Sequence, residues 1–316
     1  MDAGQLIADA ALALYDLPPG ATAQMINLSE NATFRVDAPN GRRWALRIHR
    51  ENYHTEIAIA SELAWVNALR AENAVITAMP TAGRNGGLIQ HVGNRMAVLF
   101  GWEDGAEPAE DNLAAAFPML GRVAAHMHRH ATGWQRPAGF TRLTWDFDGA
   151  FGPRPHWGDW RAGMGITAAR EALFARTLAL IEKRLEAFGK DNSRFGLVHC
   201  DMRLANLLVD GARVKVIDFD DCGFSWHLYD CATALSFIEH RADVPELIDA
   251  WVSGYREIAA LPLEDAAEIP TFVMFRRLLL VAWIGSHAET GLAQSLGVPY
   301  TEQTAALCET YLRGFG

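Results

Sequence analysis

The chain has 316 residues, 50% of them hydrophobic, which is enough to bury the core of one large domain or of two lobes. Its 28 basic and 38 acidic residues give a net charge of −10 at pH 7. This acidic surplus argues against nonspecific binding to nucleic acid or to anionic membranes. An acidic pocket would suit a cationic substrate, although net charge does not locate one.

Location and redox state follow from other features of the composition. No C-x-x-C spacing occurs among the four cysteines, which predicts reduced thiols in a cytoplasmic protein: Cys200, Cys222, Cys231 and Cys308. The first residues lack the basic region of a secretory signal, and the most apolar run, Leu278 to Ile284, is too short to span a membrane. We therefore expect no membrane partner, and the oligomeric state cannot be read.

The first hundred residues are predicted to form a small sheet with helices. Apolar spacing from Leu6 to Leu14 predicts a short helix that ends at Pro18-Pro19-Gly20. Three strands follow at 24–28, 33–36 and 44–48, then a helix at 56–69 and two strands at 87–91 and 95–100. The first two strands are joined by Ser29-Glu30-Asn31, and the next two by Pro39-Asn40-Gly41.

From residue 112 the pattern is mostly helical. Helices are predicted at 117–130, 168–188, 226–238, 244–258, 266–289 and 300–313. The stretch Trp145 to Gly165 interleaves tryptophans with aspartates and contains several Gly and Pro. It fits either a substrate-side loop for a cationic ligand or a packed irregular insertion.

The most informative stretch is GLVHCDMRLANLLVDGARVKVIDFDD, from Gly196 to Asp221. Two apolar runs, 207–209 and 214–218, flank Asp210-Gly211 and predict a hairpin. Polar side chains therefore gather at strand ends and loops: Asp201, Asn206 and Asp218. A carboxylate and an amide five residues apart, with a second carboxylate after a strand, can bind Mg²⁺ and leave one carboxylate facing a hydroxyl. These groups suit phosphoryl transfer.

The motif His199-x-Asp201-x-x-x-x-Asn206, followed by Asp218-Phe219-Asp220, resembles the catalytic and metal-binding loops of protein-kinase-like enzymes. The surrounding sequences, HCDMRLANLLV and IDFDDCGFSWHLYDCATALSF, are most similar to the aminoglycoside phosphotransferases and type II homoserine kinases. The resemblance implies an α+β, two-lobed protein-kinase-like fold. Residues 1–101 would form a nucleotide-binding lobe with a small antiparallel sheet and one helix, and residues 102–316 a mainly helical catalytic and substrate-binding lobe.

The resemblance also implies ATP and Mg²⁺ as cofactors and assigns nucleotide-binding residues. Ser29 and Asn31 would lie over the phosphates, although an ordinary hairpin turn fits the same residues. Arg47 stands where the family usually has a phosphate-holding lysine, and the two side chains differ in reach. Glu62, rather than Glu56, matches the glutamate that pairs with that basic residue. The segment Phe100-Gly101-Trp102 resembles the hinge whose backbone binds adenine.

The same resemblance assigns catalytic roles. Asp201 would orient the acceptor hydroxyl and finally accept its proton, and Arg203 would neutralise the transferring phosphoryl group. Asp218 and Asn206 would bind the metal. An aspartate at the position of Asp230 would brace the catalytic loop by accepting backbone N–H bonds.

Four further residues are candidate substrate contacts. Asp220 and Asp221 are additional carboxylates after the metal-binding strand, and they could equally serve the metal or only the turn. Trp283 and His287 lie toward the end of an apolar helix, where polar residues are commonly exposed.

The implied reaction is transfer of the γ-phosphate of ATP to a hydroxyl of a small cationic or zwitterionic molecule, such as an amino alcohol, homoserine or an aminoglycoside. A protein serine/threonine kinase of the stress-response type is an alternative. About ten residues separate Asp218 from Tyr229-Asp230, too few for a long peptide-holding activation segment. A catalytically weak nucleotide-binding regulatory module is a third reading, which Arg47 in place of lysine leaves open.

Overall fold

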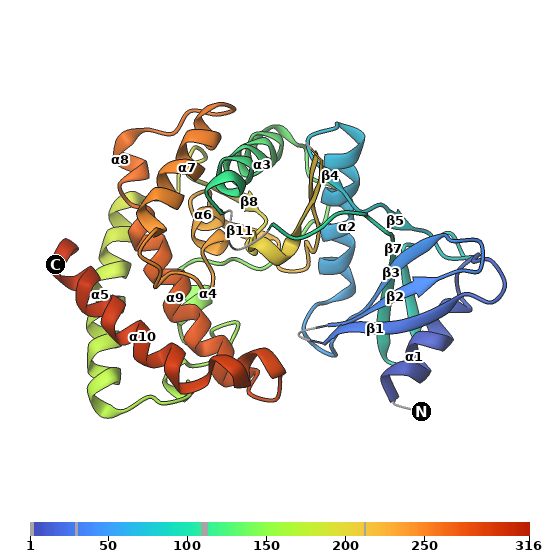
Figure 1. The fold of residues 1–316 in the computed structure, drawn as a ribbon, viewed down its shortest axis with the longest axis horizontal. Helices are drawn as coiled ribbons and strands as arrows, with labels where there is room; N and C mark the ends of the chain where they lie inside the picture. The colour runs from blue at the N-terminus through green and yellow to red at the C-terminus, as the bar shows by residue number, and fades with distance from the viewer. Residues whose placement is uncertain (1–2, 29–30, 109–112, 212) are drawn as a thin grey trace. The chain divides into compact units, whose positions relative to one another are not determined.

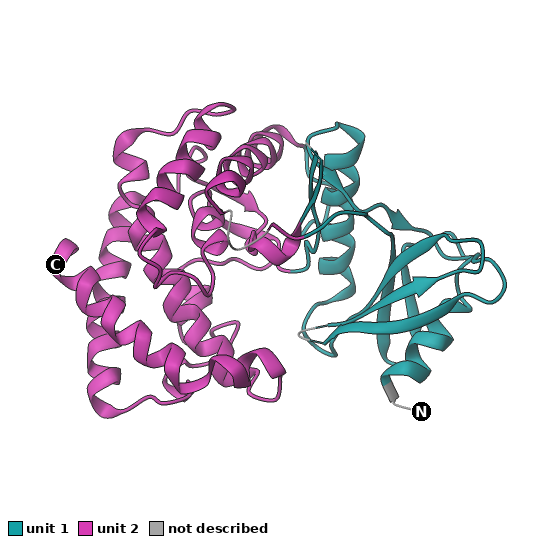
Figure 2. Ribbon diagram, viewed as in Figure 1, with its two compact units in different colours: residues 1–106, 135–142, 208–220 teal, residues 107–134, 143–207, 221–316 magenta. Residues whose placement is uncertain are grey.

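The structure is a computed structural model that describes residues 3–28, 31–108, 113–211 and 213–316 (Figure 1). The chain divides into two compact units (Figure 2). Unit 1 comprises Met1–Ala106, Gln135–Arg142 and Leu208–Asp220, and unit 2 comprises Glu107–Trp134, Leu143–Leu207 and Asp221–Gly316. Both units are assembled from separate parts of the chain. The assignment of residues 1–101 to nucleotide binding and of residues 102–316 to catalysis and substrate binding stays a prediction.

Unit 1 contains an antiparallel sheet of strand order β1-β2-β3-β7-β5, in which β6 also pairs with β7. Its strands are β1 Thr22–Leu28, β2 Ala32–Asp37, β3 Arg43–Ile48, β5 Pro80–Thr81, β6 Ile89–Val92 and β7 Arg95–Gly101. A second sheet has the order β4-β10-β9, with β4 Ile76–Thr77, β9 Leu207–Asp210 and β10 Arg213–Val216. The strands predicted before residue 101 are therefore present, within a few residues at their ends.

The larger sheet carries a different helix against each face. On β3, the alternating residues Trp44, Leu46 and Ile48 join one core cluster with α1, Ala3–Leu12. The opposite face packs against α2, Glu56–Ala71, through Ile59 and Leu63. Alternation places Arg47 on this second face.

The helix α2 has the apolar spacing of a packed helix. Thr55 caps its start by accepting a hydrogen bond from the Ala58 N–H at 3.2 Å. Its buried residues include Ile59, Glu62, Leu63 and Val66, so the glutamate lies on the apolar stripe and is directed at the sheet. Glu62 therefore faces the strand that carries Arg47.

Unit 2 is mainly helical. Its helices are α3 Leu113–Gly133, α4 Phe147–Phe151, α5 Ala168–Phe188, α6 Tyr229–Ala234, α7 Val244–Arg256, α8 Leu263–Ala266, α9 Ile269–Ser286 and α10 Gly291–Phe315, with short 3₁₀ turns η2 Trp160–Ala162 and η3 Leu204–Asn206. Two strands, β8 Phe195–Val198 and β11 Gly223–Trp226, pair antiparallel. At the close approach of α3 and α7, a Cβ on Gly121 would collide with the Trp251 carbonyl.

The structure departs from the sequence predictions in several elements. The second hairpin strand ends at Val216, not at residue 218, and the helix predicted at 226–238 is confined to Tyr229–Ala234. The tryptophans of the 145–165 stretch are buried, which favours the packed insertion: Trp145, Trp157 and Trp160.

One described helical stretch, Leu263–Ser286, is long and apolar enough to cross a membrane, but 83% of its most apolar window is buried inside the protein. A core helix satisfies the same criteria, so this stretch is weak support for a membrane span.

Candidate functional site

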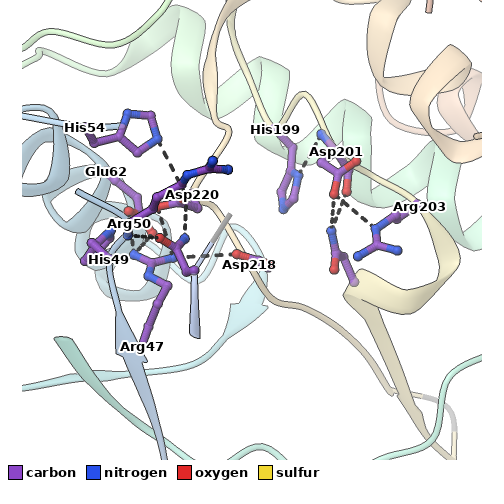
Figure 3. Close-up of polar contacts among 12 residues, drawn as sticks. Arg47, His49, Arg50, His54, Glu62, His199, Asp201, Arg203, Asp218 and Asp220 are labelled. Atoms are coloured by element: carbon purple, nitrogen blue, oxygen red, sulfur yellow. Dashed lines mark hydrogen bonds and ion pairs between the residues drawn. The ribbon is translucent and has the colours of Figure 1, made fainter. Parts of the chain in front are cut away.

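The candidate residues lie in both units. In unit 1 the group centres on Arg47 (Figure 3). Arg47 Nη2 lies 2.7 Å from both Glu62 carboxylate oxygens, and both side chains are buried. Arg47 Nη1 lies 3.6 Å from Asp218 Oδ1. Arg47 therefore connects the helix glutamate with the predicted metal-binding aspartate.

The charge of Arg47 is stabilised by this setting. Burial alone would lower the pKa of the guanidinium, but the carboxylates of Glu62, Asp220 and Asp218 outweigh it and raise the pKa. Figure 3 shows Arg47 directed toward these acids. A permanently charged arginine held between acids is suited to binding a phosphate oxygen.

Asp220 is the second centre of the unit 1 group. Its Oδ2 accepts a hydrogen bond from Asn31 Nδ2 at 2.6 Å, and Asn31 Oδ1 accepts one from the Arg50 N–H at 3.1 Å. His49 Nδ1 and His54 Nε2 lie 3.5 and 3.6 Å from the Asp220 carboxylate. Asp220 is thus a buried anchor for the end of β3 and for Asn31, and its predicted contact with substrate stays a prediction.

Burial and charge fix the protonation states in this cluster. Burial lowers the pKa of His49 to about 3, helped by Arg47, so the imidazole is neutral near pH 7. Burial would raise the pKa of Asp220, but the charge of Arg47 leads the effects that hold it well below the usual range. The carboxylate is therefore ionised throughout the physiological range.

Asp218 is the most exposed acid of this group, with 46% of its side chain accessible. Its φ of 62° lies in the left-handed region, which is uncommon for a residue other than glycine. Asp218 follows the strand β10, which ends at Val216. An accessible carboxylate of this kind fits a magnesium ligand.

In unit 2 the group centres on Asp201, which precedes η3 (Figure 3). Asn206 Nδ2 donates to the Asp201 carbonyl and to Asp201 Oδ2, both at 2.8 Å. Arg203 Nε donates to the same carboxylate oxygen at 3.2 Å. Because Asn206 uses its nitrogen for both bonds, its oxygen is the atom suited to a cation such as Mg²⁺.

A second arginine at Asp201 was not predicted from the sequence. Arg276 Nη2 donates to Asp201 Oδ1 at 2.7 Å from within the buried helix α9. Burial would raise the pKa of Asp201, but Arg203, Arg276 and the Asn206 hydrogen bond lower it. The available signal was an arginine within the apolar run FVMFRRLLLVAWI, since a buried charge requires a partner.

The backbone before Asp201 is held by Asp230 on α6, as predicted. The His199 and Cys200 N–H groups donate to its two oxygens at 3.1 and 2.8 Å. Cys200 has φ 66°, a left-handed conformation that these bonds stabilise. His128 Nε2 lies 2.9 Å from the same carboxylate. Burial would raise the pKa of Asp230, but the His128 contact leads the effects that lower it.

His227 packs against His128, the histidine that contacts Asp230, and it makes the stability of this region depend on pH. Its ring stacks on His128 with centroids 4.7 Å apart, and burial lowers its pKa to about 3. The unfolded chain takes up this proton near pH 6.5, so acidification favours unfolding by about 1.4 kcal/mol per pH unit between these values. His227→Gln should reduce this slope in urea unfolding at pH 7, 6 and 5. The exposed His240→Gln serves as the control, and an unchanged slope in His227→Gln would contradict the prediction.

The remaining nucleotide candidates lie in unit 1. The Phe100 ring centroid is 5.1 Å from the Arg47 guanidinium carbon. The Trp102 N–H donates to the Arg43 carbonyl at 3.3 Å, so an adenine bond there would replace this contact. Ser29 lies outside the described residues, and its role stays a prediction.

The candidate substrate contacts of unit 2 are mostly buried. Trp283 and His287 stack with centroids 4.9 Å apart, and both side chains lie inside the protein, contrary to the exposure expected at a helix end. Asp221 is half-buried, and its carbonyl accepts from Trp145 Nε1 at 2.9 Å. Their predicted contact with substrate stays a prediction.

Comparisons with known proteins identify a family and several similar proteins. The model of the phosphotransferase enzyme family matches residues 24–267. The solved structure of a microcompartment-associated aminopropanol kinase is 42% identical, covers 98% of both chains and has a TM-score of 0.91. An uncharacterised protein of Deinococcus radiodurans is 28% identical over 286 residues, 86% of this chain and 79% of the relative. Amicoumacin kinase hAmiN, solved with AMP-PNP, Ca²⁺ and Ami, is 18% identical over 97% of this chain and 94% of the other, with a TM-score of 0.77.

Proposed function

Because the chain belongs to the phosphotransferase enzyme family, we propose that it transfers the γ-phosphoryl group of ATP to the hydroxyl of a small amino alcohol. The observation that carries this proposal is the ionised Asp201 carboxylate, held by Asn206, Arg203 and Arg276 on a braced loop. The 42% identity to an aminopropanol kinase over 98% of both chains directs the choice of acceptor.

Several sequence predictions are confirmed at the level of the family. The chain is a kinase of this phosphotransferase family with a protein-kinase-like fold. ATP and Mg²⁺, the cofactors of such kinases, fit the AMP-PNP and Ca²⁺ found with amicoumacin kinase. The choice among amino alcohols, hydroxy amino acids and amino sugars belongs to the proposal.

In the proposed reaction, each group of residues has a separate task. In unit 1, Arg47 binds a phosphate oxygen while Glu62 keeps the guanidinium oriented. When bound, Mg²⁺ would neutralise phosphate charge; Asp218 of unit 1 and Asn206 of unit 2 each offer an oxygen suited to it. Arg203 stabilises negative charge on the transferring group.

Asp201 accepts the hydrogen bond of the acceptor hydroxyl and finally its proton. The lowered pKa of Asp201 makes the carboxylate a weak base. In a loose transition state proton transfer is late, so orientation of the hydroxyl contributes more than basicity. The carboxylate therefore has to be held in place rather than made more basic.

The local chain path favours a small acceptor over a protein. Only eleven residues, 219–229, lie between Asp218 and Asp230, and they include the strand β11 and the first residue of α6. No long activation segment exists in this described stretch to hold a peptide. A protein kinase of the stress-response type is for this reason the second candidate.

The test is ADP release by the wild-type enzyme with ATP and Mg²⁺ across a panel of acceptors. Aminopropanol, ethanolamine, homoserine, an aminoglycoside and a generic protein substrate would be compared with water alone. We expect an amino alcohol to raise turnover at least about tenfold, because correct placement of the hydroxyl replaces a random encounter with water. Stimulation by the protein substrate alone would favour the second candidate, and stimulation by none would contradict both.

A further inference from the structure

Arg276 is an arginine buried in an apolar helix, with 3% of its side chain exposed. All three guanidinium nitrogens donate hydrogen bonds. Nη2 donates to Asp201 Oδ1 at 2.7 Å, Nη1 to the Tyr229 hydroxyl at 3.1 Å and Nε to Ser236 Oγ at 3.1 Å. These partners come from the loop before η3, from α6 and from the residues after α6, so the planar fork is fixed in three directions.

The ring of Trp157 fixes the remaining freedom of the guanidinium. The Arg276 guanidinium carbon lies 5.1 Å from that ring centroid and 5.8 Å from the centroid of Tyr229. Both aromatic residues are buried. Rotation of the guanidinium would break its hydrogen bonds and its cation–π contacts, which makes Arg276 a rigid support for whatever it binds.

Asp201 is held differently at its two oxygens. Oδ1 accepts from Arg276, while Oδ2 accepts from Asn206 and Arg203. The Arg203 side chain is 28% exposed and comes from the same short loop as Asp201, so it moves with that loop. Arg276 binds the Asp201 carboxylate from the buried helix α9, and it therefore links this carboxylate to the core of unit 2.

Arg277, the next residue of α9, shows what a purely structural arginine looks like here. It donates to Glu239 at 2.7 Å, and neither side chain has any exposure. Glu239 belongs to no candidate site. Asp201, by contrast, is the proposed base and keeps 13% of its side chain exposed. Arg276 therefore binds a carboxylate that is proposed to act in the reaction, whereas Arg277 binds one that belongs to no candidate site.

We propose that Arg276 is a positioning residue of the phosphotransferase reaction: it fixes the rotation of the Asp201 carboxylate so that this group orients the acceptor hydroxyl. This inference rests on the proposed function and adds a determinant of it outside the catalytic loop. Arg276 acts through Asp201 and bonds neither nucleotide nor phosphate in this role. Its loss should therefore lower kcat and leave the KM for ATP nearly unchanged.

The first test compares Arg276→Met and Arg276→Lys in steady-state turnover with the best acceptor. Arg276→Met should lower kcat roughly 100-fold, the loss expected when a reacting group is misplaced by about 1 Å. Arg276→Lys should lose roughly tenfold, because an ammonium keeps the charge but not the three-way fork. The KM for ATP should change less than about threefold in both variants. Equal effects on kcat and on the KM for ATP would overturn the proposal.

A double-mutant cycle separates positioning from general damage. In an Asp201→Asn background, Arg276→Met should change the residual kcat by less than about threefold, since no base remains to be positioned. Arg277→Met is the matched control. It should lower the urea midpoint at least as much as Arg276→Met but leave the kcat of the folded enzyme within about threefold of wild type. Multiplicative losses in the double variant, or an equal kcat loss in Arg277→Met, would overturn the proposal.

Urea unfolding of the same variants requires no acceptor. The effects of Arg276→Met and Asp201→Asn on the urea midpoint should not add up in the double variant, because each substitution breaks the same Arg276–Asp201 ion pair. Additive effects would contradict the pairing itself. A wild-type enzyme that no acceptor stimulates would overturn the proposed function and the catalytic purpose of Arg276, even if the pairing were demonstrated.

Discussion

Asp201→Asn is expected to lower kcat for acceptor phosphorylation by about 10³-fold while changing the KM for ATP less than about threefold. Asparagine keeps the shape of the side chain but removes its charge and an acceptor oxygen. The hydroxyl of the acceptor then loses its orienting partner and its proton sink. Arg47 and Glu62, proposed to bind the nucleotide, and Asp218, proposed to bind the metal, belong to unit 1 and are not altered by the substitution.

The substitution also leaves Arg276 without its carboxylate. Because Arg276 is buried, the loss of its counter-charge should destabilise unit 2 by about 3 kcal/mol, so turnover must be normalised to folded protein. The exposed Asp249→Asn provides a control of the same chemistry away from the site, expected to keep wild-type kcat. A kcat within tenfold of wild type in Asp201→Asn would contradict the proposed role of this residue.

The sequence predicted those contacts whose residues stand at positions that the family resemblance marks. The family resemblance assigned Glu62 as the partner of Arg47, and the structure shows this pair in contact at 2.7 Å, with Glu62 on the buried side of α2. Asp230 was found similarly, from the position of one aspartate relative to the catalytic loop. In both cases the resemblance supplied the residue and its partner, and the structure supplied the distance.

The contacts that were missed depend on packing between distant elements. Arg276 and Asp201 are 75 residues apart, and α9 is buried on nearly all sides, so its residue pattern selects no face. His54 and Asn31 meet Asp220 only after β3, its flanking loops and the hairpin assemble. Burial of Trp283 and His287 likewise follows from neighbours that no local signal identifies.

Arg47→Met is expected to destabilise the protein by about 3–5 kcal/mol and to raise the KM for ATP at least about tenfold. The substitution leaves Glu62 and Asp220 as buried carboxylates without their main counter-charge. It also removes the proposed phosphate contact. Urea unfolding measures the first effect, and ATP titration of turnover under folding conditions measures the second.

Arg47→Lys keeps the positive charge but removes the planar guanidinium, so it separates the effect of charge from that of geometry. It also introduces the residue that the family usually has at this position. A single ammonium cannot reproduce contacts that the two terminal nitrogens of Arg47 make, with Glu62 on one side and with Asp218 and Asp220 on the other. We expect a loss of about 1–2 kcal/mol in stability, less than for methionine, with most of the ATP affinity retained because the positive charge remains. Arg43, on the same strand as Arg47, supplies the control: it pairs with Asp104, both side chains are exposed, and Arg43→Met should cost under about 1 kcal/mol. If Arg47→Met were no more destabilising than Arg43→Met, the buried network would not be the support that positions the nucleotide groups of unit 1.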